Sequence, residues 1–155
     1  MTKKKYQPFL FKKFEIHQNN AAMKIGTDGI LLGAWADCEN KKNGLDIGCG
    51  TGVIAIMICQ KNPIIKMTAL EISNEAIKDA IINFNICKWN NNLTLYHQDI
   101  NKHIPTKKYD FIVSNPPFYN DGFKPKNKEK SLAKHEEDLN YKSVITFAKR
   151  NLTEK

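Results

Sequence analysis

Hydrophobic residues recur with two different periods along this chain, and the two patterns predict its secondary structure. Short apolar runs predict four buried strands, over residues 45–47, 66–72, 93–97 and 109–114. Apolar residues at helical spacing predict helices over residues 53–60, 73–87 and 139–150. Strands that alternate with helices are typical of a parallel sheet covered on both faces. We therefore expect an α/β fold with an open, mostly parallel sheet and helices on both faces.

The N-terminal part of the chain follows a different pattern. Residues 9–18 alternate between apolar and polar side chains, which predicts a short strand or a hairpin. Thr27 and Asp28 have side chains suited to N-caps, and they precede a helix predicted over residues 29–36. We therefore expect residues 1–36 to form a segment that flanks the main domain.

The main domain, residues 37–155, is expected to be a single domain that is incomplete at its end. A helix in an α/β fold normally returns to another strand, but this chain ends soon after the helix predicted over residues 139–150. Residues 111–113 are apolar on both faces of their strand, as in a central strand, and here we expect them at an exposed edge. The later strands of the fold are therefore expected to be missing.

The composition fits one globular domain with a charge suited to polyanions. Of the 155 residues, 41% are hydrophobic and 26% are charged, which is ordinary for globular proteins. The net charge of +8 suits nucleic acid, although a gene composition that favours lysine gives the same balance without such a partner. The longest apolar run, residues 53–59, is far shorter than the roughly 20 residues that span a membrane. We expect a cytoplasmic protein.

The cysteines are spread along the chain without a C-x-x-C pair or a nearby histidine at ligand spacing. Neither a metal site nor a disulfide framework is therefore expected. Cys59 and Cys87 lie on apolar helix faces, so we expect them to be small core residues.

A glycine-rich stretch, Asp46-Ile-Gly-Cys-Gly-Thr-Gly52, follows a predicted strand and opens a predicted helix. Its glycines let the backbone approach a ligand closely. The spacing G-x-G-x-G differs from the G-x-G-x-x-G of dinucleotide dehydrogenases. Glu71 and Asp99 end the next two strands, and the carboxyl ends of parallel strands meet at one edge of a sheet. The set predicts a ligand crevice there; a tight turn with solvated acidic strand ends is the alternative.

The sequence Asn115-Pro-Pro-Phe118 follows the fourth predicted strand. Two adjacent prolines donate no backbone N–H and fix φ, so this loop is stiff. Stiffness at the end of a buried strand is useful where a ligand must be held against the loop. Because Asn-Pro also marks ordinary turns, a turn without function is the alternative.

The glycine-rich stretch resembles the class I S-adenosylmethionine-dependent methyltransferases, which have a Rossmann-like fold. The resemblance implies S-adenosyl-L-methionine as the cofactor, with the glycines under its methionine and ribose and Asp46 close to its ammonium group. It also implies that Glu71 holds the ribose and that Asp99 with Ile100 frames the adenine. The cofactor-binding residues implied in this way are Asp46, Gly48, Cys49, Gly50, Gly52, Glu71, Ile72, Asp99, Ile100 and, through the free N–H groups of its helix, Thr27.

The second motif, Asn115 to Phe118, resembles that of methyltransferases that modify planar amino nitrogens. An exocyclic amine is a poor nucleophile because its lone pair is delocalised into the ring. The resemblance implies that the Asn115 side-chain oxygen and the Pro116 carbonyl accept from the two N–H groups of the amine. Pro117 then fixes the geometry, which is preorganisation. Phe118 stacks on the flipped-out base.

The substrate depends on the rest of the chain, because two kinds of enzyme share this motif. Enzymes that methylate a glutamine amide of release factors usually have Tyr in place of Phe118. Residues 11–18, 22–36 and 133–136 instead resemble the valine-tRNA adenine-N6 methyltransferases, which more often have Arg in place of Lys134. This resemblance implies methyl transfer to N6 of an adenosine in tRNA. The alternatives are glutamine-amide methylation, adenine in rRNA or DNA, and a truncated remnant that binds without turnover.

Many lysines lie near the second motif and in the N-terminal arm. Contacts from these lysines to tRNA phosphates would make binding sensitive to salt; a solvated loop is the alternative. We expect tRNA as the partner, with no membrane and no metal. The lysines are Lys3, Lys4, Lys5, Lys12, Lys13, Lys124, Lys126, Lys128, Lys130 and Lys134.

Overall fold

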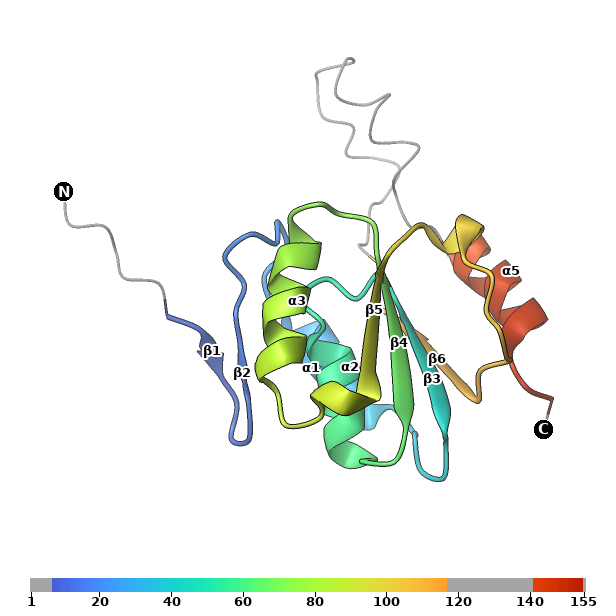
Figure 1. The fold of residues 1–155 in the computed structure, drawn as a ribbon, viewed down its shortest axis with the longest axis horizontal. Helices are drawn as coiled ribbons and strands as arrows, with labels where there is room; N and C mark the ends of the chain where they lie inside the picture. Colours follow the sequence, from blue (N-terminus) through green and yellow to red (C-terminus); the bar gives the residue numbers. More distant parts are fainter. Residues whose placement is uncertain (1–6, 117–140, 155) are drawn as a thin grey trace, which may run out of the picture.

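A parallel sheet of four strands forms the centre of the molecule (Figure 1). The computed structural model describes residues 7–116 and 141–154. The strands lie in the order β5-β4-β3-β6, and each neighbouring pair is parallel, which confirms the expected sheet. Their bounds, within two residues of those predicted, are Asn43–Ile47 for β3, Lys66–Glu71 for β4, Leu93–His97 for β5 and Phe111–Ser114 for β6.

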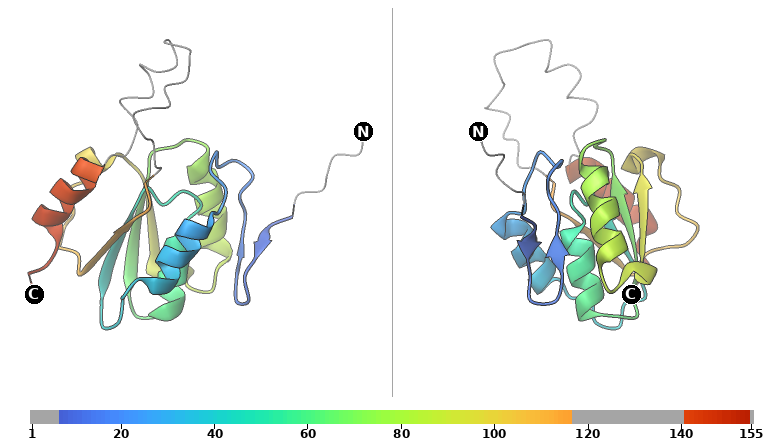
Figure 2. Two further views of the ribbon diagram at one scale, coloured as in Figure 1. Left: turned by 180° about the vertical axis from the view of Figure 1, so that it is seen from behind. Right: turned by 60° about the vertical axis from the view of Figure 1, so that its left-hand side comes forward.

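Helices cover both faces of this sheet, as Figure 1 and the two views of Figure 2 show. One face carries α1 (Thr27–Trp35), α2 (Val53–Lys61) and α3 (Ala76–Ile86). The other face carries α5 (Tyr141–Asn151). Right-handed crossovers from β3 to β4 and from β4 to β5 place α2 and α3 on the same face. The helices on both faces confirm the expected α/β architecture.

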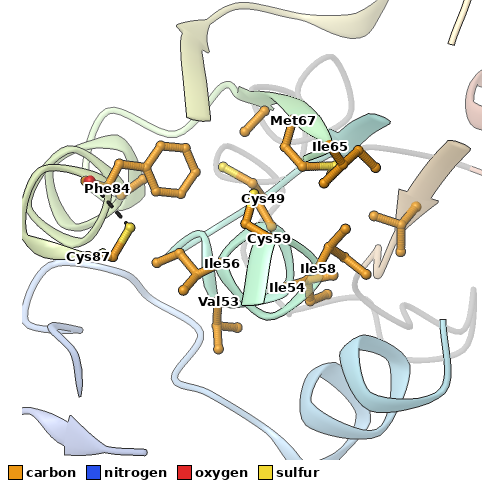
Figure 3. Close-up of a cluster of buried hydrophobic side chains, with 14 of the residues drawn as sticks. Cys49, Val53, Ile54, Ile56, Ile58, Cys59, Ile65, Met67, Phe84 and Cys87 are labelled. Carbon is orange, nitrogen blue, oxygen red and sulfur yellow. Dashed lines mark hydrogen bonds between the residues drawn. The ribbon is translucent and has the colours of Figure 1, made fainter. Parts of the chain in front are cut away.

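The larger hydrophobic core surrounds α2, as the close-up in Figure 3 shows. This helix is apolar at nearly every position, so it has to be covered on all sides. The sheet residue Met67 and the α3 residue Phe84 lie against it. Cys59 and Cys87 are 0% and 5% exposed, which confirms the expectation that they are core residues. The buried residues of α2 are Val53, Ile54, Ala55, Ile56, Ile58 and Cys59.

A smaller core lies between the sheet and α5. Phe147 of α5 packs there with Leu45, Ile47, Leu70, Ile100 and Tyr109. Residues on both faces of β3 are therefore buried, as expected for a central strand of a parallel sheet.

The N-terminal part forms the expected hairpin. The strands β1 (Phe9–Leu10) and β2 (Glu15–Ile16) pair antiparallel. Phe11 and Phe14, in the turn between them, stack with ring centroids 4.4 Å apart. Ile16 is 0% exposed and belongs to the larger core, so the hairpin packs against the main domain.

The predicted start of α1 is wrong. Thr27 and Asp28 lie inside the helix. The N-cap is Gly26, which has no side chain to accept a hydrogen bond from the helix. Both residues have the side chains of caps, but the helix begins at Thr27, two residues before the predicted start. Asp28 remains favourable there, because an acidic side chain in the first turn complements the helix dipole.

The strand β6 lies at one end of the described sheet, and one residue beside it is paired with the end of α5. The Tyr109 N–H donates to the carbonyl oxygen of Asn151 over 2.8 Å, and the Thr153 N–H donates to the carbonyl oxygen of Tyr109 over 2.9 Å. Tyr109 and Leu152 form an isolated parallel bridge. The described chain therefore begins to pair with this edge as it leaves α5.

Candidate functional site

The turn between β3 and α2 has a backbone conformation that favours glycine. Gly48, Gly50 and Gly52 have φ angles of 70°, 57° and 81°, in a region that residues with a Cβ rarely adopt. The N–H groups of Gly48 and Cys49 donate to the carbonyl oxygen of Leu70 over 2.9 and 3.0 Å. These bonds tie the turn to β4 at the carboxyl edge of the sheet.

Two of these glycines have different surroundings. A Cβ on Gly52 would lie 2.3 Å from Cε1 of Phe84, so the turn packs closely against α3 at this position. A Cβ on Gly50 would meet no heavy atom within 4 Å. The packing of α3 therefore requires Gly52, whereas the backbone at Gly50 is open to a ligand.

Glu71 ends β4, is 7% exposed and binds the turn through its carboxylate. Its Oε2 accepts from the N–H of Gly50 over 2.7 Å. Its Oε1 accepts from the N–H groups of Ile72 and Ser73 over 2.9 and 2.8 Å. Because a carboxylate has about four acceptor positions, these three bonds leave room for a further donor such as a hydroxyl group.

Asp46 is a buried carboxylate that lacks hydrogen bonds. It is 0% exposed, and neither carboxylate oxygen has a hydrogen-bond partner of ordinary geometry among the described residues. Burial raises the pKa of Asp46 to about 7; the Ala55 amide opposes this shift and the charge of Glu71 adds to it. Leaving a buried carboxylate unpaired is costly. A cationic ligand group beside Asp46 would lower that cost.

Three further residues predicted to bind the cofactor, Ile72, Asp99 and Ile100, differ in exposure. Ile72, directly after β4, is 37% exposed. Asp99 caps the short 3₁₀ helix η2 (Ile100–Lys102), and its Oδ1 accepts from the N–H of Asn101 over 2.8 Å. Ile100 is 6% exposed and packs in the smaller core, so its side chain offers little surface to a ligand. The assignment of Asp99 and Ile100 to the adenine, and of Ile72 to the cofactor, stays a prediction.

The end of β6 brings Asn115 to the same edge of the sheet. The Ser114 hydroxyl donates to the carbonyl oxygen of Ile47 over 2.8 Å, which fixes the end of β6 beside the end of β3. A Cβ on Gly29 would lie 3.7 Å from Nδ2 of Asn115, so the first turn of α1 is a neighbour of Asn115. Thr27 is exposed at the start of that helix.

The remaining predicted site residues are only partly within the described ranges. Pro116 is described and buried. Pro117 and Phe118 lie outside the described residues, as do Lys3 to Lys5 and the lysines from Lys124 to Lys134. Lys12 and Lys13 are exposed near the N-terminal hairpin.

Asp79 of α3 is a buried residue that sequence reasoning missed. It is 0% exposed, and its Oδ2 accepts from the N–H groups of Asn20 and Ala21 over 2.8 and 2.7 Å. Its Oδ1 accepts from the Asn20 side-chain amide over 2.7 Å. Burial acts to raise the pKa of Asp79, but these hydrogen bonds outweigh it and lower the pKa. A carboxylate held in this way stays charged and binds the segment that leads to α1.

Asn83, one turn further along α3, was missed as well. Its Oδ1 accepts from the N–H of His17 over 2.7 Å. Its side-chain amide donates to the carbonyl oxygens of His17 and Thr51, each over 2.8 Å. Asn83 therefore joins the N-terminal segment to the glycine turn. The available signal was a polar pair four residues apart, Asp79 and Asn83, on the apolar face of a helix.

Residues 7–116 and 141–154 contain neither a group of metal ligands nor a helix that could span a membrane. No group of three or more His, Cys, Asp or Glu side chains there is placed to hold a metal ion. No helix in these ranges has the length and apolar character that crossing a membrane requires.

The sequence of this chain is similar to known methyltransferases. Residues 20–151 match the family described as methyltransferase small domain. A protein of Aliivibrio salmonicida named tRNA1(Val) (adenine(37)-N6)-methyltransferase is 40% identical over 147 residues, which cover 95% of this chain and 63% of that protein. A protein of the same name from Haemophilus influenzae is 45% identical over 130 residues, which cover 82% and 56%. The chain thus spans about three fifths of the length of these relatives.

The fold also resembles a solved structure. The protein YjhP of E. coli matches with a TM-score of 0.57 and 13% identity, over 83% of this chain and 46% of that protein. This likeness concerns the fold alone, and it agrees with the parallel sheet described above.

Proposed function

Because this chain belongs to the methyltransferase small domain family, we propose that it transfers a methyl group from S-adenosyl-L-methionine to N6 of an adenosine in tRNA. The names of its relatives specify adenine 37 of a valine tRNA, and we extend that substrate to this chain. The observation that carries the proposal is the meeting of the glycine turn, Asp46 and Asn115 at one edge of the sheet.

The turn and its acidic neighbours fit this cofactor. Asp46 is an unpartnered buried carboxylate, which suits the ammonium and sulfonium charges of the ligand. Gly50 has open space where a side chain would lie, so the backbone with Gly48, Cys49 and Gly52 can pass under the ligand. Glu71 has acceptor capacity left for the ribose hydroxyls. Asp99 and Ile100 are assigned to the adenine, Ile72 to the cofactor, and the first N–H groups of α1 at Thr27 to the carboxylate.

The proposed reaction needs little acid–base chemistry from the protein. S-adenosyl-L-methionine supplies an electrophilic methyl group bound to a sulfonium sulfur. Asn115 accepts from one N–H of the adenine amine and the Pro116 carbonyl from the other, which holds the lone pair of the nitrogen towards the methyl group. Pro117 stiffens the loop and Phe118 stacks on the base. The methylated nitrogen then loses its extra proton to solvent.

The proposal includes a role for the N-terminal segment and for the lysines. Residues 1–36 flank the substrate and the cofactor, while residues 37–155 form the methyltransferase core. Lys12, Lys13 and the lysines from Lys124 to Lys134 contact tRNA phosphates, which makes binding weaken as salt rises. Since its substrate is tRNA, we place the protein in the cytoplasm.

Label transfer from methyl-tritiated S-adenosyl-L-methionine tests this function. Unmodified total tRNA, rRNA, DNA and release factor are offered separately to the chain, and the labelled nucleosides or amino acids are identified. The expected product is N6-methyladenosine in tRNA. Labelled glutamine in release factor, or labelled adenine only in rRNA or DNA, would replace the proposed substrate. Binding of the cofactor without label in any acceptor would make the chain a binding protein.

A further inference from the structure

A cavity of about 330 Å³ lies between η2 and α5, apart from the site described above. It is on the α5 side of the sheet, where η2 packs against α5 (Figure 1). Ile100 lines the cavity, and the residue before it, Asp99, belongs to the candidate site. The cavity therefore lies next to the candidate site.

Two cationic side chains on one face of α5 line this cavity. Lys142 and Arg150 are eight residues apart with Thr146 midway, so all three lie on one helix face. Their backbone positions are about 12 Å apart at 1.5 Å rise per residue. Among residues 7–116 and 141–154, no carboxylate lies within ion-pair distance of either cation. Arg150 is also the single arginine among the 24 cationic side chains of the chain.

The opposite wall of the cavity carries the polar side chains of His103 and Asn101. The two ring nitrogens of His103 lie 3.1 Å from Oε1 of Gln98 and 2.9 Å from the hydroxyl of Tyr109, so the ring is held in place. Burial lowers the pKa of His103. Asn101 lies on the same wall, and none of the described residues that line the cavity is acidic. Among these residues, the positive charge of the cavity is therefore not offset.

We propose that this cavity binds the phosphate backbone of the RNA substrate, with Arg150 and Lys142 as its cationic contacts. The inference rests on the proposed function, because it takes tRNA as the substrate. A guanidinium group matches a phosphate with two parallel N–H donors, and an ammonium group adds a point charge. Thr146 supplies a hydroxyl donor between them. Because the two side chains leave the helix about 12 Å apart, they can contact different phosphates of one polymer.

Charge-neutralising variants of the full chain test this surface. Lys142→Gln with Arg150→Gln removes both cations, and Lys78→Gln with Lys88→Gln is the matched control, since both lysines are exposed on the α3 side of the sheet. Affinity for unmodified tRNA is measured across a series of salt concentrations. The slope of log affinity against log salt is expected to fall by between about one and two in the cavity variant, with roughly tenfold weaker binding at low salt. Cofactor affinity, measured by titration, is expected to be unchanged in both variants.

A third variant, Arg150→Lys, separates charge from geometry. It keeps the charge but loses the paired donors, so tRNA affinity is expected to fall several-fold with an unchanged salt slope. If the wild-type chain methylates tRNA but the cavity variant behaves like its control, the cavity proposal is wrong and the proposed function stands. If the wild-type chain neither binds nor methylates tRNA, both proposals are wrong.

Discussion

Asp46 is the residue whose surroundings most clearly require a ligand. A carboxylate that is 0% exposed and has no hydrogen-bond partner of ordinary geometry among the described residues destabilises the folded chain whenever it is ionised. The ordinary value for this group is 3.8, and burial raises the pKa of Asp46 to about 7. Between these two values the unfolded chain loses its proton and the folded chain keeps it. The free energy of unfolding therefore falls as pH rises through this window.

The variant Asp46→Asn is expected to remove this pH dependence. Its free energy of unfolding should exceed that of the wild type by an amount that grows by about 3 kcal/mol between about pH 5 and about pH 7.5. Denaturant unfolding of both proteins at each pH measures the gap. The same variant should bind S-adenosyl-L-methionine more weakly near pH 7.5. A gap that stays constant with pH would show that Asp46 does not titrate in this range.

Asn115 is expected to act on the transfer step alone. Replacing Asn115 with Ala removes the acceptor for the amine, so methyl transfer should fall by at least about a hundredfold. Cofactor affinity should stay within about twofold, because Asn115 has no cofactor contact in the proposed arrangement. Single-turnover kinetics and cofactor titration measure the two quantities. An equal loss of affinity and activity would place Asn115 in cofactor binding.

Glu71 is expected to show the reverse behaviour. The variant Glu71→Gln keeps the size of the side chain but removes its charge and part of its acceptor capacity. Cofactor affinity should weaken by roughly tenfold or more, as expected when a hydrogen bond to a charged group is lost. The transfer rate at saturating cofactor should change little. Unchanged affinity would remove Glu71 from the proposed ribose site.

At the scale of elements, the glycine turn combines two constraints that paired variants can separate. Gly50→Ala meets only the backbone strain of its positive φ, which costs roughly 1–2 kcal/mol. Gly52→Ala adds overlap with Phe84, so its loss of stability should be larger. Cofactor affinity should respond most to Gly50→Ala, where the added methyl group fills the open space. Thermal unfolding ranks the two variants by stability, and cofactor titration ranks them by affinity. Equal losses of stability and of affinity in both variants would contradict the separate roles of Gly50 and Gly52.

The N-terminal segment is held by α3, and Asn83 offers the sharpest test of that contact. Asn83→Ala removes three hydrogen bonds to backbone groups, so stability should fall by about 2–4 kcal/mol. The amide proton of His17 should also exchange faster than in the wild type. Asn85→Ala, on the exposed face of the same helix, is the matched control and should change stability by less than about 0.5 kcal/mol. Similar losses in the two variants would mean that the contact contributes little.

For the whole molecule, the sequence predicted what depends on local pattern. Apolar runs and glycine spacing are local, so the strands were predicted to within two residues, as were their parallel direction and the position of the turn. Asp79 and Asn83 were missed because polar residues on a helix usually indicate solvent. Their partners, His17 and Asn20, lie about 60 residues away in sequence. The start of α1 was predicted wrongly because Thr27 and Asp28 are favourable both as caps and in the first turn.

The burial of the cysteines makes the molecule suited to thiol-labelling kinetics. Cys38, Cys49, Cys59 and Cys87 are all buried, and burial raises the pKa of each thiol. Since alkylating reagents need an accessible thiolate, each cysteine should react only when its surroundings open. All four belong to the larger core, and Cys49 lies in the glycine turn, so it would report opening where that turn joins the core. If the cofactor slows alkylation of Cys49 more than that of Cys59, it stabilises the glycine turn more than the rest of the core. The native cysteines would therefore map local stability without any engineered probe.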